Sequence, residues 1–161
     1  MSFLMFPVRR LNEWHVIPAL AVSLALLCRF VTPYMWIASL AYAFMVSGML
    51  FRKSSRRIHV YLMSSAMALD LALVGTLEIK RNAVEKALEF SLGPWQQAHI
   101  MASLLALSLY GPVFALGLWR YLRPGSPAPA RLWHIRLGIA AFVLRSLGFL
   151  LMFSMLGMHN G

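Results

Sequence analysis

The stretch RKSSRRIHVYLMSSAMALDLALVGTLEIKRNAVEKALE, residues 52–89, decides the fold. A cluster of basic residues runs directly into an apolar segment, and that segment carries His59, Asp70 and Glu78. A helix that spans a bilayer needs about 20 predominantly apolar residues, and residues 58–79 supply them. Because an ionised side chain at membrane depth costs several kcal/mol, Asp70 needs either a partner or a function.

The rest of the chain has the composition of a membrane protein. Of its 161 residues, 60% are hydrophobic and only 12% are charged, and the mean hydropathy is +0.70. These values lie outside the range of soluble globular domains. Five apolar runs approach the length of a span, at about 14–31, 33–51, 58–79, 95–119 and 133–157. We therefore predict an all-α fold, a polytopic membrane bundle of about five transmembrane helices that forms one integral membrane domain over residues 1–161.

The charge distribution predicts how this bundle is oriented. A net charge of +10 would suggest nucleic acid in a soluble protein, but here the 15 Lys and Arg residues gather at the ends of the apolar runs. They are better explained by contact with the lipid bilayer than with nucleic acid. Most of them fall on the side that carries the N-terminus, so we expect a bacterial inner (cytoplasmic) membrane protein with a cytoplasmic N-terminus and an external C-terminus.

Proline and glycine mark several predicted helix boundaries. Pro33 suits the first turn of the second span, where its missing N–H costs nothing. The third helix is expected to continue past the membrane surface, because apolar and charged residues keep helical spacing through residues 77–92. Gly93 and Pro94 would then end it and start the next helix, and YLRPGSPAPARL, residues 121–132, reads as a surface loop.

Two residue pairs share one spacing on helices that run in the same direction. His59 and Asp70 are 11 residues apart, and so are His134 and Arg145. Eleven residues make about three helical turns, which return a side chain to the same face roughly 16 Å deeper. If these two helices are neighbours, His59 faces His134 near the inner surface.

The same spacing places Asp70 and Arg145 opposite each other near mid-membrane. As a buried ion pair, each charge makes the other tolerable and helps to fix the helix register. The alternative, which the sequence leaves open, is that Asp70 belongs to a proton path or a ligand site.

The histidines are the candidate ligands. Neutral imidazole binds many metals, and two histidines from parallel helices suit haem b or a site for copper, iron or zinc. His15 lies at the same predicted level as His59 and His134 and is a possible third partner. The other interpretation is that each histidine is an amphipathic residue among lipid headgroups.

A second candidate couple lies at the opposite surface. His99 opens the fourth predicted span, at a level that matches Glu78, and the two could bind a metal or relay a proton. A hydrogen-bonded interfacial pair is the alternative. The sequence has no phosphate loop, no CxxC, no nucleophile elbow and no HExxH, so it does not indicate an enzyme.

Three histidine motifs carry a resemblance to a known family. They are His59 in RRIHVYLM, His99 in AHIMASLLAL and His134 in LWHIRLG, and they extend over about residues 35–157. In this pattern the chain resembles the CtaM-like family of small bacterial membrane proteins linked to the assembly of haem-copper oxidases. The resemblance implies an accessory protein of the respiratory chain that is associated with haem or a metal.

We therefore expect a membrane accessory protein that binds haem or a transition metal through histidines, in respiratory complex assembly or electron transfer. The alternative is a non-catalytic subunit or scaffold of a larger membrane complex, in which the buried charges only hold helices together. The small size of the bundle favours docking to a larger membrane protein complex or formation of a homo-oligomer.

Overall fold

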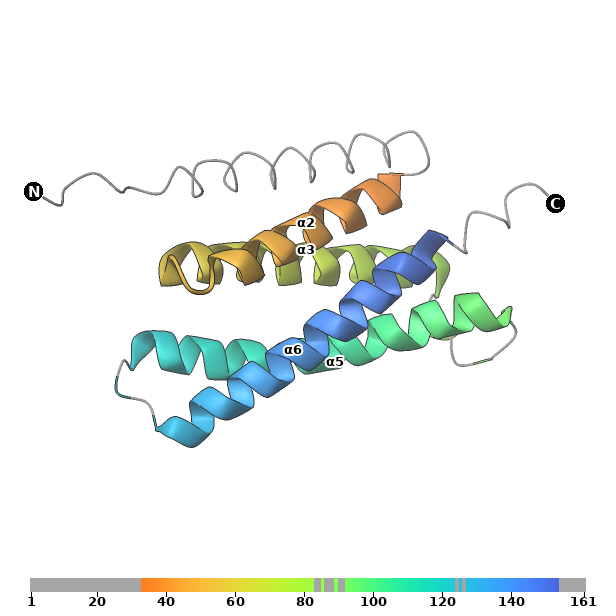
Figure 1. Cartoon of the computed structure of the whole chain (residues 1–161). Helices are drawn as coiled ribbons and strands as arrows, with labels where there is room; N and C mark the ends of the chain where they lie inside the picture. Colours follow the sequence, from red (N-terminus) through yellow and green to blue (C-terminus); the bar gives the residue numbers. More distant parts are fainter. Residues whose placement is uncertain are drawn as a thin grey trace, which may run out of the picture.

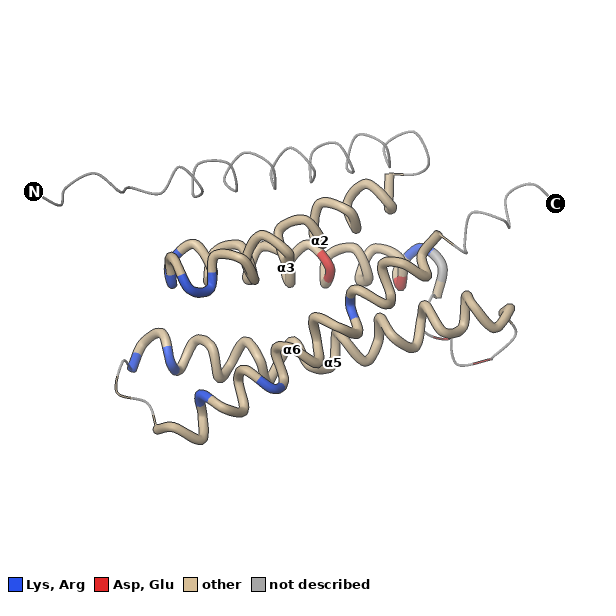
Figure 2. The backbone as a smooth tube through the Cα atoms, in the orientation of Figure 1, with Lys and Arg blue, Asp and Glu red and all other residues tan. Residues whose placement is uncertain are grey.

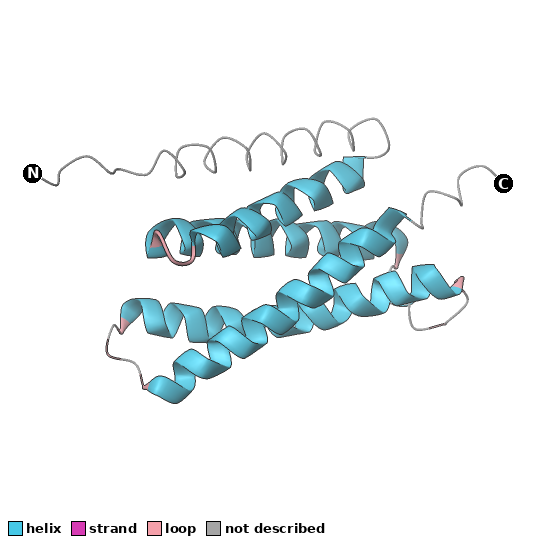
Figure 3. Cartoon of the chain, viewed as in Figure 1, coloured by secondary structure: helices cyan, strands magenta, loops and turns pink. Residues whose placement is uncertain are grey.

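The computed structural model describes residues 33–82, 85, 89, 92–123, 125 and 127–153. Within these residues all regular structure is helical, as Figure 3 shows, which confirms the predicted all-α class for this part of the chain. The helices are α2 (Pro33–Phe51), α3 (Arg56–Arg81), α5 (Pro94–Leu122) and α6 (Ala128–Leu151). Each is long and apolar enough to cross a membrane. The structure thus contains four of the five predicted spans, and the predicted span 14–31 lies outside the described residues.

A short serine turn joins α2 to α3. The backbone N–H groups of Ser54 and Ser55 both donate to the carbonyl of Phe51, at 3.1 and 2.9 Å. Ser55 has extended backbone and caps α3, because its hydroxyl accepts the N–H of Ile58 at 3.4 Å. The tight turn therefore brings Arg52 and the start of α3 to the same end of the molecule.

The third helix is interrupted at Asn82 and does not run unbroken through residue 92 as predicted. α3 ends at Arg81, and Asn82 adopts a left-handed conformation with φ of 46°. Its N–H donates to the carbonyl of Glu78 at 2.9 Å, which satisfies one of the carbonyls left free at a helix end. Asparagine tolerates this conformation better than most residues, so α3 ends at a local cap.

Proline opens the next two helices. α5 begins at Pro94 as predicted, and the N–H of Gly93 just before it donates to Oε1 of Gln96 at 2.9 Å. α6 begins at Ala128, earlier than predicted, because Pro129 fits the first turn of a helix as well as a loop. α5 continues through Pro112 without a break.

The helices form two hairpins. α2 packs along α3, and α5 packs along α6; between the hairpins, α2 contacts α6 and α3 contacts α5. Figure 1 shows the two hairpins side by side, with α6 crossing toward α2 at the end where the described chain finishes. Figure 2 shows that basic residues gather at the opposite end, where the α2–α3 turn and the start of α6 lie.

Two apolar clusters join the hairpins. The larger one takes buried residues from all of the described helices, namely Met45, Ala66, Met67, Tyr110, Val113 and Ala141. The smaller one joins α2 to α6, where the rings of Tyr42 and Phe149 stack with centroids 4.3 Å apart. The hydroxyl of Tyr42 also donates to Oγ of Ser146 at 3.1 Å. These contacts close the bundle at the end away from the basic residues.

Candidate functional site

Asp70 and Arg145 form the predicted ion pair at the centre of the bundle. Nε and Nη2 of Arg145 donate to the two carboxylate oxygens of Asp70, each at 2.7 Å. The residues are only 3% and 6% exposed. This two-point geometry matches the planar guanidinium to the carboxylate and is the strongest form of an ion pair. The arrangement supports a structural role for both charges.

The residue that the sequence analysis missed is Tyr110 of α5. Its hydroxyl donates to Oδ2 of Asp70 at 2.6 Å, and its side chain is buried. A tyrosine in the interior of an apolar span was the available signal, because its hydroxyl needs a partner there. The carboxylate of Asp70 therefore accepts three hydrogen bonds, from residues on two other helices.

The helices that carry the ion pair are not direct neighbours. Among the described residues, the backbone of α3 approaches α2 and α5, and no close approach joins it to α6. The long side chain of Arg145 bridges the separation. We expected His59 and His134 to meet if α3 and α6 were neighbours. The two helices are not neighbours, yet both side chains line one cavity.

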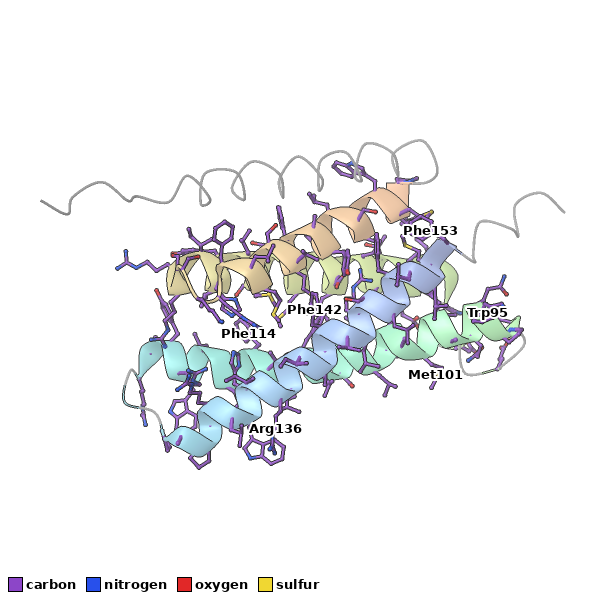
Figure 4. All side chains as sticks on the ribbon, in the orientation of Figure 1. Trp95, Met101, Phe114, Arg136, Phe142 and Phe153 are labelled. Carbon is purple, nitrogen blue, oxygen red and sulfur yellow. The ribbon has the colours of Figure 1, made fainter. Side chains whose placement is uncertain are left out.

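Both of these histidines line one cavity between the hairpins. It has a volume of about 600 Å³ and lies toward the basic end of the bundle. Its apolar wall comes mainly from α3, α5 and α6, with Met49 added from α2, and includes Val60, Met63, Met67, Phe114, Leu118 and Ile135. Figure 4 shows Phe114 in the space between the two hairpins. The cavity is the candidate functional site.

Each histidine of the cavity is held by a backbone carbonyl of an adjacent helix. Nδ1 of His59 lies 2.7 Å from the carbonyl of Gly48 on α2, and Nδ1 of His134 lies 3.2 Å from that of Val113 on α5. The two imidazoles are close enough to interact electrostatically. A carbonyl accepts only from a protonated Nδ1, so in a neutral ring Nε2 carries the lone pair. This is the arrangement in which a histidine binds a metal.

Glycine allows His134 to approach α5. A Cβ atom placed on Gly117 would lie 3.0 Å from Cε1 of His134, which is tighter than an ordinary contact. The small residue thus lets the ring pack against the helix backbone beside the cavity.

His99 lies elsewhere, away from the cavity lining. Its Nδ1 is 2.6 Å from the carbonyl of Gly148 on α6, within the same hairpin. The structure therefore brings two of the three candidate histidines together and separates the third. The couple of His99 with Glu78 stays a prediction, and His15 lies outside the described residues.

Methionines add sulfur to the cavity. Met49, Met63 and Met67 all line it, although the sequence shows no clustered array of methionines. Thioether sulfur is a soft ligand that suits copper(I), and imidazole suits copper, iron and zinc. Within the described residues, no group of three or more His, Cys, Asp or Glu side chains lies together.

Comparison with family models, with curated proteins and with solved structures gave no significant match to this chain. The resemblance to the CtaM-like family therefore stays a prediction from the histidine motifs. What the structure defines is the class: an all-α protein in which four described helices have the length and composition of membrane spans.

Proposed function

We propose that this chain is a membrane accessory protein that binds haem or a transition metal through His59 and His134. It would serve the assembly of a respiratory complex or electron transfer to one. The observation that carries this proposal is that both histidines line one apolar cavity and each has Nδ1 directed at a backbone carbonyl. A hydrogen bond from Nδ1 to a carbonyl fixes the orientation of a metal-binding imidazole and raises the basicity of its other nitrogen.

The donor set suits two kinds of centre. Haem b would be held by His59 and His134, and the apolar cavity walls would surround it. Copper(I) would instead use the same imidazoles together with the thioether of Met63 or Met49. A bound haem would supply one-electron chemistry, whereas a bound copper ion would be cargo for insertion into another protein.

We further propose that the basic end of the bundle faces the cytoplasm of a bacterial cell. Support comes from the cluster of cations beside the cavity, since Lys and Arg are enriched on the cytoplasmic side of membrane proteins. In this orientation the described part of α6 ends on the external side, and the cavity would open toward the cytoplasm.

Visible absorption and metal analysis of the full chain, purified in mild detergent, test the proposal. We expect a haem band or stoichiometric copper, which His59→Ala and His134→Ala each remove. His99→Ala is the matched control, because its Nδ1 also meets a backbone carbonyl, yet it lies outside the cavity lining. Met63→Leu should weaken copper binding and leave a haem band unchanged.

Two results would reject this function. A folded preparation without colour or metal, after growth with added haem and copper, would favour the alternative of a non-catalytic subunit or scaffold of a larger complex. Loss of the centre in His99→Ala, with retention in His59→Ala, would move the site out of the cavity.

A further inference from the structure

The mouth of the cavity is lined by cations from both hairpins. Arg52, Lys53 and Arg56 come from the α2–α3 hairpin, and Arg120 and Arg131 come from the α5–α6 hairpin. None of the described residues that line the cavity is acidic. We call these five residues the basic rim.

The charges of the basic rim are not neutralised by the described part of the protein. Arg56 donates to the backbone carbonyl of Arg120 and lies 5.3 Å from the ring centroid of Tyr121, so its partners are a carbonyl and an aromatic face. Nε of Arg120 is buried without a hydrogen-bond partner among the described residues. Arg120 is also close enough to Arg56 and Arg131 for their charges to repel. An anion at the rim would relieve this repulsion.

The walls below the basic rim are apolar. Val60 and Met63 of α3 face the same cavity as Leu118 of α5 and Ile135 and Ile139 of α6. A ligand that satisfies both parts must have an anionic head and an apolar tail. A soluble anion would leave about 600 Å³ of largely apolar space uncovered.

We propose that the cavity binds an anionic phospholipid, with its phosphate on the basic rim and part of an acyl chain between the hairpins. Basic pockets between transmembrane helices at the cytoplasmic side are typical sites for acidic lipid headgroups. The inference does not rest on the proposed function, because cations attract the phosphate whereas imidazoles would ligate a metal ion; a haem in the cavity would exclude the acyl chain. Variants of the basic rim that keep both histidines separate the two ligands.

Native mass spectrometry of the delipidated full chain in detergent measures this binding. Titration with phosphatidylglycerol is compared with titration with phosphatidylcholine, which carries the same chains but no net charge. We expect phosphatidylglycerol to bind at least about tenfold more tightly, because each basic residue near an anionic lipid contributes roughly a factor of five. Inorganic phosphate at millimolar concentration should not displace the lipid.

The test variant is Arg52→Gln with Arg131→Gln, which removes two rim charges and leaves the contacts of Arg56 in place. We expect its dissociation constant for phosphatidylglycerol to rise roughly 30-fold. Lys80→Gln with Arg136→Gln is the matched control, since it removes two exposed charges outside the cavity lining. Figure 4 shows Arg136 on the side of α6 away from the space between the hairpins. The control should bind within about twofold of the wild type.

The charge-conserving variant Arg52→Lys with Arg131→Lys should retain binding, and circular dichroism verifies helix content in each case. Equal affinity for the two lipids, or equal loss in the rim and control variants, would overturn the proposal. Displacement of the lipid by inorganic phosphate would also overturn it and would assign the rim to a soluble phosphate.

Discussion

Replacement of Asp70 by asparagine tests whether the central ion pair holds the hairpins together. The substitution keeps the shape of the side chain but removes the charge that accepts two bonds of 2.7 Å from Arg145. A hydrogen bond to a charged group contributes about 1.5–3 kcal/mol, so the two bonds together account for roughly 3–6 kcal/mol. Breaking a buried pair on one side typically costs about 3–5 kcal/mol, which agrees. We therefore expect Asp70→Asn to lower the free energy of unfolding by about 3–5 kcal/mol.

A double-mutant cycle shows whether the cost belongs to the pair. Arg145→Gln alone should also destabilise, because it leaves the carboxylate of Asp70 buried with Tyr110 as its remaining partner. The double variant Asp70→Asn, Arg145→Gln removes both charges of the pair, so it should be more stable than either single variant. Tyr110→Phe removes one bond and should cost about 1.5–3 kcal/mol.

Reversible unfolding in mixed micelles, with increasing dodecyl sulfate and detection by far-UV circular dichroism, measures these free energies. Arg136→Gln is the matched control on the same helix, because this arginine is exposed, and it should change stability by less than about 0.5 kcal/mol. A cost below about 1 kcal/mol for Asp70→Asn would refute the reasoning. So would single costs that simply add in the double variant.

Three further substitutions test other parts of the structure. Gly117→Ala should displace the ring of His134 and weaken the binding of haem or metal, whereas Gly138→Ala should not, because its Cβ would meet nothing within 4 Å. Equal effects of the two variants in a haem or metal titration would contradict this. Asn82→Ala should destabilise by about 1 kcal/mol and Asn82→Gly should not, because only alanine is strained at φ of 46°; thermal melts that rank them in reverse would exclude the cap. Tyr42→Phe keeps the ring stack but loses a hydrogen bond, so unfolding should show a cost of about 0.5–1.5 kcal/mol, and no measurable cost would show the bond to be dispensable.

The central ion pair is a tertiary contact that residue spacing in the sequence could predict. Two spacings of 11 residues, on helices that run in the same direction, predicted that Asp70 meets Arg145 if the two helices are neighbours; the ion pair forms although they are not. The reason is that an α-helix converts residue number into depth and direction with little variation. The same spacing predicted that His59 and His134 come to one site, and the structure places both on one cavity.

Residue spacing could not predict which helices pack against each other. The spacing predicts the depth of a residue but not which helix stands beside it, so Tyr110 of α5 was missed as the third member of the cluster. It also could not show that α3 and α6 stand apart within the described bundle, or that a carbonyl of a different helix holds each histidine. Met49 of α2 reaches the same cavity as Met63 and Met67, which lie one turn apart on α3, for the same reason.

Hydropathy along the sequence by itself determined the helical class and the bounds of α2, because a bilayer requires long apolar segments whose backbone bonds are satisfied internally. The left-handed conformation of Asn82 sets the end of α3. The cavity and its basic rim exist only in the tertiary structure. The buried ion pair and the Tyr42–Phe149 stack join the two hairpins, which leave a space at their other end. This space depends on how the hairpins pack, so it cannot be predicted from any single helix.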